Sequence, residues 1–216
     1  MGISQPRKHT QFILRFITEP QPGPLFNYPA NELKPSTIHT SREERAAIVD
    51  RFGSKLIDVV GEGQQNIFHS PLSIHEALTL AASGSAKTTL DAFVRVLELP
   101  KEKSSLNFQA FLTAVNQREN TIQVFKVSIS LWLSSKLPKY EDFIDHSRFA
   151  FKAESEQLDF YDKDSVKKIN ECISENTHGK ITQIVKELRH NQRLIIINTI
   201  YQSKLRGEVL INWYHK

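Results

Sequence analysis

Apolar residues recur along the chain with two different spacings, and the spacing predicts which segments are helices and which are strands. Four segments carry the helical spacing of three to four residues, at positions 48–59, 72–83, 90–97 and 108–115. A fifth helix is predicted from about Glu141. A sixth is predicted within residues 162–181, where Val166, Ile169 and Ile173 share one face and Gly179 is suited to a left-handed end.

Three other segments have the pattern of β-strands. In residues 123–134, Val127, Ile129, Leu131 and Leu133 alternate with serines and a tryptophan, which predicts one core face. A weaker strand is predicted around residues 151–160. Residues 194–200 are almost continuously apolar, the pattern of a strand covered on both faces, and Asn198 interrupts that run. Helices and strands together predict an α+β fold.

The stretch from Asn66 to Ile74, NIFHSPLSI, passes from a predicted strand directly into a predicted helix. Ser70 is a good N-cap, and Pro71 suits the first helical position, where no N–H donor is needed. This leaves Ser73 as a second polar residue on a helix that otherwise has core character, much as Asn198 stands in a buried strand. Either both residues bond nearby backbone groups, or the serines meet Asn198 in a hydrogen-bonded cluster beneath a sheet, since a buried polar group without a partner costs about 1–3 kcal/mol.

The N-terminal segment has a different composition from the rest. Five of the nine prolines fall between Pro20 and Pro35, where fixed backbone angles and missing donors oppose regular structure. We therefore predict a disordered, proline-rich arm over residues 1–40 and a folded domain over residues 41–216.

Composition and charge narrow the classes of function. The chain is 39% hydrophobic, and its 28 basic and 24 acidic residues, net charge +4, alternate rather than gather, which argues against nucleic acid as a partner. No apolar run approaches membrane-spanning length, and no signal peptide is predicted. The single cysteine, Cys172, excludes an internal disulfide and leaves the compartment open.

Candidate catalytic and cofactor motifs fail on their context. Residues 61–66, GEGQQN, lack the third glycine of a dinucleotide fingerprint and follow a helix, so they predict a turn. His69, His75 and Glu76 lack the spacing of metal ligands, and structural or surface roles are expected for the histidines. Ser70 next to a histidine has no strained nucleophile elbow around it. We expect no enzyme activity, no cofactor and no metal.

Three motifs in order, NIFHSPLSI, KKINECISENTHGKI and RLIIINTIY, resemble those of the serpin family of protease inhibitors over residues 41–206. The resemblance implies helices A to F, the sixth strand of sheet B at 66–69, and the second, first and third strands of sheet A. It also implies that Ser70, Ser73 and Asn198 form the shutter, a polar cluster that controls the opening of sheet A and can exchange partners.

The chain also departs from the family pattern. Arg206 replaces the tryptophan of the breach, and Cys172 replaces a tryptophan of helix F. The sequence stops at Lys216, before the reactive-centre loop and the C-terminal half. Serpin inhibition requires a protease to cleave that loop and the freed segment to insert as a new strand. A truncated serpin-like fold that does not inhibit by loop insertion is therefore expected.

The alternative function is a non-inhibitory binding protein that uses an exposed sheet edge or the proline-rich arm. A serine protease is the expected partner of any full-length form. For the 216-residue chain, self-association or chaperone binding is expected, because truncation would leave residues 194–200 as an unprotected edge. The family resemblance favours an extracellular location, and the lack of a signal peptide favours the cytoplasm.

Overall fold

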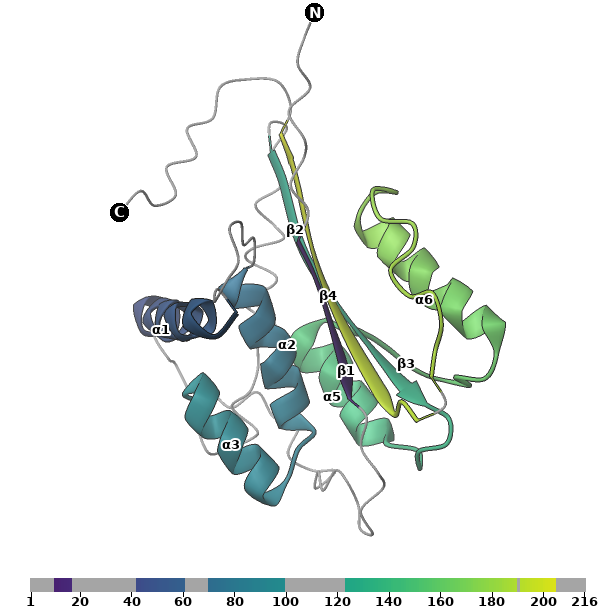
Figure 1. Ribbon diagram of the computed structural model, residues 1–216, viewed down its shortest axis with the longest axis horizontal. Helices are drawn as coiled ribbons and strands as arrows, with labels where there is room; N and C mark the ends of the chain where they lie inside the picture. Colours follow the sequence, from purple (N-terminus) through teal and green to yellow (C-terminus); the bar gives the residue numbers. More distant parts are fainter. Residues whose placement is uncertain (1–9, 17–41, 61–69, 100–122, 190, 205–216) are drawn as a thin grey trace, which may run out of the picture.

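The computed structural model describes residues 10–16, 42–60, 70–99, 123–189 and 191–204. These residues form helices and strands, which are shown in Figure 1. In chain order they are β1 (Thr10–Phe16), α1 (Arg42–Val60), α2 (Pro71–Ser83), α3 (Lys87–Leu97), β2 (Gln123–Ser134), α5 (Glu141–Phe151), β3 (Glu154–Leu158), α6 (Lys163–Asn176) and β4 (Leu194–Lys204).

The four described strands form one sheet in the order β1-β4-β2-β3. β4 runs antiparallel to β2 along its whole length, and β2 pairs in parallel with β3. On its other side, β4 pairs antiparallel with β1 from Leu194 to Ile200. Helices α1, α2 and α3 lie on one side of this sheet and α6 lies on the other (Figure 1). The fold is thus helical on both faces of a central mixed sheet, in agreement with the predicted α+β class.

The two faces of the sheet have separate apolar cores, which follow from the two-residue period of the strands. On the α2 and α5 side, the core residues from β2 pack with Ile196, Leu80 and Phe143; these β2 residues are Val127, Ile129, Leu131 and Leu133. On the α6 side, Trp132, Ile195 and Ile197 pack with Ile169 and Ile173. Both cores exclude solvent. Each contains large side chains that are less than 2% exposed, contributed by strands and by helices.

Helices α1, α2 and α3 are joined by a third, smaller core of Phe52, Ile74 and Leu97. α1 approaches the start of α2 closely at Gly53, where a Cβ atom would lie 2.7 Å from Cγ of Pro71. At the far end of α3, Glu98 is bound by Arg51 and Lys55 of α1. The lack of a side chain at Gly53 lets α1 approach α2, and the ion pairs of Glu98 hold α1 against the end of α3.

Most of the elements predicted from periodicity are present. The helices near 48–59, 72–83, 90–97 and 141, the helix within 162–181, and the three strands are confirmed. Gly179 has a positive φ of 71° and its N–H donates to the carbonyl of Ser174 at 2.7 Å, as a helix-ending glycine should. The helix predicted at 108–115, the strand at 66–69 and the turn at 61–66 lie outside the described residues.

Three expectations are wrong. Residues 10–16 form β1 although they belong to the segment predicted to be a disordered arm, because pairing with a distant strand supplies hydrogen bonds that local composition does not reveal. For the same reason the edge of β4 is not unprotected over residues 194–200. The second face of β2 is core as well, since α6 covers it and leaves Trp132 fully buried.

Candidate functional site

The candidate site is the contact between the start of α2 and β4, where the sequence places polar residues in apolar surroundings. α2 begins at Pro71, and Ser70 before it has an extended backbone. The hydroxyl Oγ of Ser70 accepts a hydrogen bond from the backbone N–H of Ser73 at 3.3 Å. Ser70 is therefore the helix N-cap, as its position in the motif predicts.

Ser73 lies on the face of α2 that packs against the sheet. It shares that face with Ala77 and Leu80, which are four and seven residues further along and belong to the core on the sheet. Ser73 is 1% exposed, and its Oγ atom has no hydrogen-bond partner. The hydroxyl is thus a buried polar group whose bonding capacity is unused.

Asn198 occupies the middle of β4 on the same side of the sheet. It pairs in register with Ile129 of β2, whose side chain belongs to the core between the sheet and α2. Asn198 is 1% exposed, and its Nδ2 atom has no hydrogen-bond partner. On the other edge of β4, Asn198 is the register partner of Phe12 in β1. The amide therefore faces the layer that also contains Ser73.

Among Ser70, Ser73 and Asn198, the structure forms a hydrogen bond only between the backbone N–H of Ser73 and Oγ of Ser70. Ser73 and Asn198 are brought to one interface, but Ser73 Oγ and Asn198 Nδ2 remain without partners, so the expected bond between the two side chains is not formed. The hydroxyl of Ser70 does not join a side-chain cluster because it already caps α2. Arg206, the position of the altered breach, lies outside the described residues.

Glu76 is a buried polar residue at this interface that sequence reasoning did not assign to the site. It lies one turn after Ser73, is 0% exposed, and neither carboxyl oxygen has a hydrogen-bond partner. Burial raises the pKa of Glu76 to about 8, and the charge of Arg45 on α1 opposes that rise. The signal in the sequence was an acidic residue inside an Ala/Leu-rich helix.

His75 has a structural role, as expected for an isolated histidine. Its Nε2–H donates to the carbonyl of Leu97 at 2.9 Å, and its ring meets Phe52 edge-on at 5.3 Å between centroids. Burial is the main cause that lowers the pKa of His75. The ring therefore ties α2 to the end of α3 and to α1 as a neutral group.

A second buried polar residue holds α6 to the segment that follows it. The side chain of Asn170 accepts hydrogen bonds from the backbone N–H groups of Ile184 and Val185 at 2.9 and 3.0 Å, and donates to the carbonyl of Val185 at 2.8 Å. Asn170 belongs to the KKINECISENTHGKI motif but was not singled out there. An asparagine on an otherwise apolar helical face was the available signal.

Cys172, two residues later, is the position at which the resemblance implies a tryptophan. Its Sγ donates to Oε2 of Glu154 on β3 at 3.3 Å, and burial raises the pKa of the thiol to about 12. The large aromatic side chain between α6 and the sheet comes instead from Trp132, whose Nε1–H donates to Oγ of Ser130 at 2.9 Å. The thiol is a hydrogen-bonded, un-ionised group.

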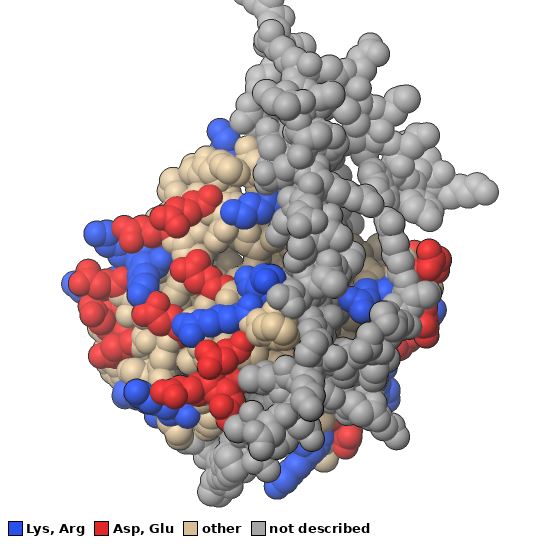
Figure 2. Space-filling view, turned by 180° about the vertical axis from the view of Figure 1, so that it is seen from behind, with Lys and Arg blue, Asp and Glu red and all other residues tan. Residues whose placement is uncertain are grey.

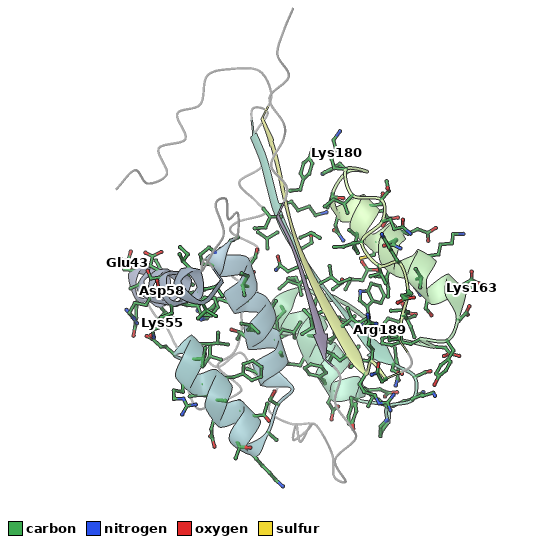
Figure 3. The ribbon with its side chains drawn as sticks, in the orientation of Figure 1. Glu43, Lys55, Asp58, Lys163, Lys180 and Arg189 are labelled. Carbon is green, nitrogen blue, oxygen red and sulfur yellow. The ribbon has the colours of Figure 1, made fainter. Side chains whose placement is uncertain are left out.

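Charged side chains lie at the outer surface. Glu43, Lys55 and Asp58 project from α1, Lys163 lies at the outer end of α6, and Lys180 and Arg189 lie in the segment after it (Figure 3). Acidic and basic side chains are interspersed on the face seen in Figure 2. Among the described residues, no group of three or more His, Cys, Asp or Glu side chains is arranged to bind a metal ion. No helix within the described part of the chain has the length and apolarity needed to cross a membrane.

The chain is similar in sequence to serpins. The family model described as Serpin (serine protease inhibitor) matches residues 47–204. An uncharacterized serpin-like protein of Thermococcus kodakarensis is 26% identical over 195 residues, which cover 84% of this chain and 45% of that protein. Alpha-1-antitrypsin of Meriones unguiculatus is 32% identical over 142 residues, covering 63% of this chain and 35% of that protein.

Solved structures give the same fold. Reaction loop cleaved lamprey angiotensinogen has a TM-score of 0.64 at 24% identity, over 74% of this chain and 48% of that chain. The reactive loop cleaved human thyroxine-binding globulin has a TM-score of 0.63 at 22% identity, over 74% of this chain and 50% of that chain. The chain thus spans half or less of the length of these relatives.

Proposed function

Because this chain belongs to the serpin family, we propose that it is a serpin-type scaffold whose sheet holds an extended segment along β4. We further propose that the 216-residue form does not trap proteases by loop insertion. The observation that carries the proposal is the antiparallel pairing of β1 with β4 over seven residues, from Thr10 to Phe16.

Loop insertion, in the mechanism that the family resemblance implies, adds a new strand to the sheet. β4 is already paired with β2 on one side and with β1 on the other. A new strand can join β4 only if it displaces β1 and replaces the backbone hydrogen bonds of that pair. β1 therefore competes with any inserting segment, which supports a binding role for this edge over an inhibitory one.

In this proposal Ser70, Ser73 and Asn198 serve as the shutter beneath β4. The burial of Ser73 and Asn198 in one interface supports the assignment. Their unused hydrogen-bonding groups are also available to a side chain or backbone group that arrives when the sheet rearranges. An interface with spare donors and acceptors can exchange partners at lower cost than a fully apolar one.

The test of the non-inhibitory proposal is incubation with trypsin-like and chymotrypsin-like proteases, followed by gel electrophoresis in detergent. No shifted, detergent-stable band is expected, while an active serpin run in parallel gives one. A clear shifted band from this chain would refute the proposal.

A second candidate function is supported by the family description and by the names of the relatives. If this sequence forms part of a longer protein, that protein is proposed to inhibit a serine protease. Neighbouring structures include thyroxine-binding globulin complexed with thyroxine, which supports ligand binding as a use of the same fold. Deletion of residues 1–16 tests the binding proposal: the shortened chain should bind a synthetic peptide of residues 10–16, and the intact chain should not.

Self-association is proposed to occur only at the outer edges of the sheet. β1 and β3 are the edge strands of the described sheet, and the guanidinium of Arg148 donates to the carbonyl of Ser155 in β3 at 2.6 Å, which occupies one acceptor there. β1 is then the edge at which a second copy would pair. Analytical ultracentrifugation of the intact chain should detect association, and a single monomeric species without hydrophobic-dye binding would contradict it.

A further inference from the structure

We propose that Glu76 is held as a neutral carboxylic acid in the folded protein at neutral pH, and that its ionisation in alkaline solution is a built-in switch that loosens α2 from the sheet. This inference is independent of the proposed function, since it concerns the contact between α2 and β4 whichever ligand the sheet receives. It rests on the position of Glu76 and on the groups around it.

The first argument is the absence of any hydrogen bond to the carboxyl group. Glu76 is 0% exposed, and both Oε1 and Oε2 are buried without a hydrogen-bond partner. Removing an ionised carboxylate from water without hydrogen bonds costs far more free energy than burying the neutral acid. The folded state therefore favours the protonated form.

The second argument is the set of groups that surround the carboxyl. The strand residues on the α2 side of the sheet include Ile129, Ile196 and Asn198, which do not titrate. Arg45 on α1 is the charged residue that acts on Glu76, and its own pKa is lowered, chiefly by burial. The helices near Glu76 carry four buried or half-buried groups that are charged or titratable. They are Arg45 of α1, His75 of α2, Glu98 at the C-cap of α3, and His146 of α5.

The third argument is the chemistry of the other unpartnered atoms. Ser73 Oγ lies one helical turn before Glu76, and Asn198 Nδ2 faces the same layer from β4. A neutral carboxyl can donate its O–H to a hydroxyl oxygen and accept an N–H from an amide, so it is complementary to both groups. An ionised carboxyl loses the donor and requires water or a closer Arg45. Meeting that requirement means separating the start of α2 from the sheet.

The direction of the pH effect follows from linkage. The folded pKa of about 8 lies above the ordinary value of 4.5. The folded state therefore holds a proton that the unfolded chain has lost, and stability falls as pH rises from 4.5 to about 8. Between pH 7 and pH 9 this group alone should increase the unfolding equilibrium constant ~10-fold, after which the effect levels off.

The pH range of the experiment avoids a group with the opposite effect. Because burial lowers the pKa of His75 from 6.5, this residue reduces stability as pH falls through that value. Measurements at pH 7 and above therefore avoid the titration of His75, and comparison with a variant at position 76 isolates the effect of Glu76. The intact chain is unfolded with urea at pH 7, 8 and 9, and the same series is run on Glu76→Gln and on Glu43→Gln, which changes an exposed residue of α1.

Between pH 7 and pH 9, the unfolding equilibrium constant of the intact chain should rise ~10-fold more than that of Glu76→Gln. The same rise is expected for Glu43→Gln. Equal pH dependence in all three would overturn the proposal.

If Glu76→Gln does not fold, infrared spectroscopy of the intact chain decides. The carbonyl band of a protonated carboxyl should be present at pH 7 and absent at pH 9, and the lack of such a band at pH 7 would overturn the proposal. Hydrogen exchange of α2 amides, corrected for intrinsic rates, should increase over the same interval; unchanged protection would show that ionisation does not loosen the helix.

Discussion

Asn170→Ala should cause a large loss of stability, because it removes buried polar contacts between α6 and the segment that follows it. The wild-type side chain makes three hydrogen bonds to the backbone of Ile184 and Val185, and only 9% of the residue is exposed. Alanine removes all three and leaves two N–H donors and one carbonyl without partners. Val185 is 0% exposed, so water does not replace its bonds.

The magnitude follows from the number of groups left unpaired. An unpaired buried donor or acceptor costs about 1–3 kcal/mol, and Ile184 is half-buried, so its N–H can recover part of that cost from water. We expect Asn170→Ala to lower the free energy of unfolding by about 3–5 kcal/mol, a large share of the 5–15 kcal/mol typical of a folded domain. Urea unfolding followed by far-ultraviolet circular dichroism measures this difference.

Two variants control for helix propensity and for loss of volume. Asn170→Asp keeps the acceptor for both N–H groups and loses only the donor to Val185, so it should be less destabilising than Asn170→Ala. Asn176→Ala, on the same helix, removes a bond to the carbonyl of Cys172 and an acceptor for Ser128 at the half-buried surface, and should cost about 1 kcal/mol. If Asn170→Ala changes stability by no more than Asn176→Ala does, Asn170 does not anchor the segment after α6.

Further predictions concern other buried residues. Asn198→Leu should leave stability within about 1 kcal/mol of wild type or increase it, because it removes an unpartnered Nδ2 from an apolar layer; a loss above about 3 kcal/mol in urea unfolding would mean that Asn198 is hydrogen-bonded in the folded state. Gly53→Ala should be destabilising because its Cβ would lie 2.7 Å from Pro71, and a melting temperature equal to wild type would show that α1 can shift. Cys172 should react with iodoacetamide at pH 8 only after unfolding, since its pKa is about 12 and it is buried; rapid labelling of the folded chain, followed by mass spectrometry, would contradict the described packing.

Much of the helical architecture could be predicted because each helix carries its own evidence. Ser70 and Pro71 mark the start of α2, and Gly179 lies beyond the end of α6 with the positive φ that such a position requires. The same local signals predicted β2, β3 and β4, whose apolar spacing is set by the sheet they help to build. The family motifs then implied the order in which these elements meet.

What escaped prediction depended on distant parts of the chain. β1 pairs with a strand about 180 residues later, and the nearby prolines gave its segment the composition of a disordered arm. Trp132 was placed on the polar face of β2 because its cover, α6, is supplied by a later segment. Glu76 was considered only as a metal ligand and rejected, because its complete burial results from packing on several sides of α2, which the helical period alone does not specify.

The central claim is that the chain's own N-terminal strand occupies the edge of β4, and a disulfide placed across that pair tests it most directly. Ile13 and Ile197 are register partners, whereas Ile195 is offset by two residues. With Cys172→Ser as background, Ile13→Cys with Ile197→Cys should form an intramolecular disulfide on mild oxidation, because directly paired residues lie within disulfide reach and diagonal ones mostly do not. Ile13→Cys with Ile195→Cys should cross-link far less. Equal cross-linking of both pairs, or no intramolecular disulfide in either, would contradict the account.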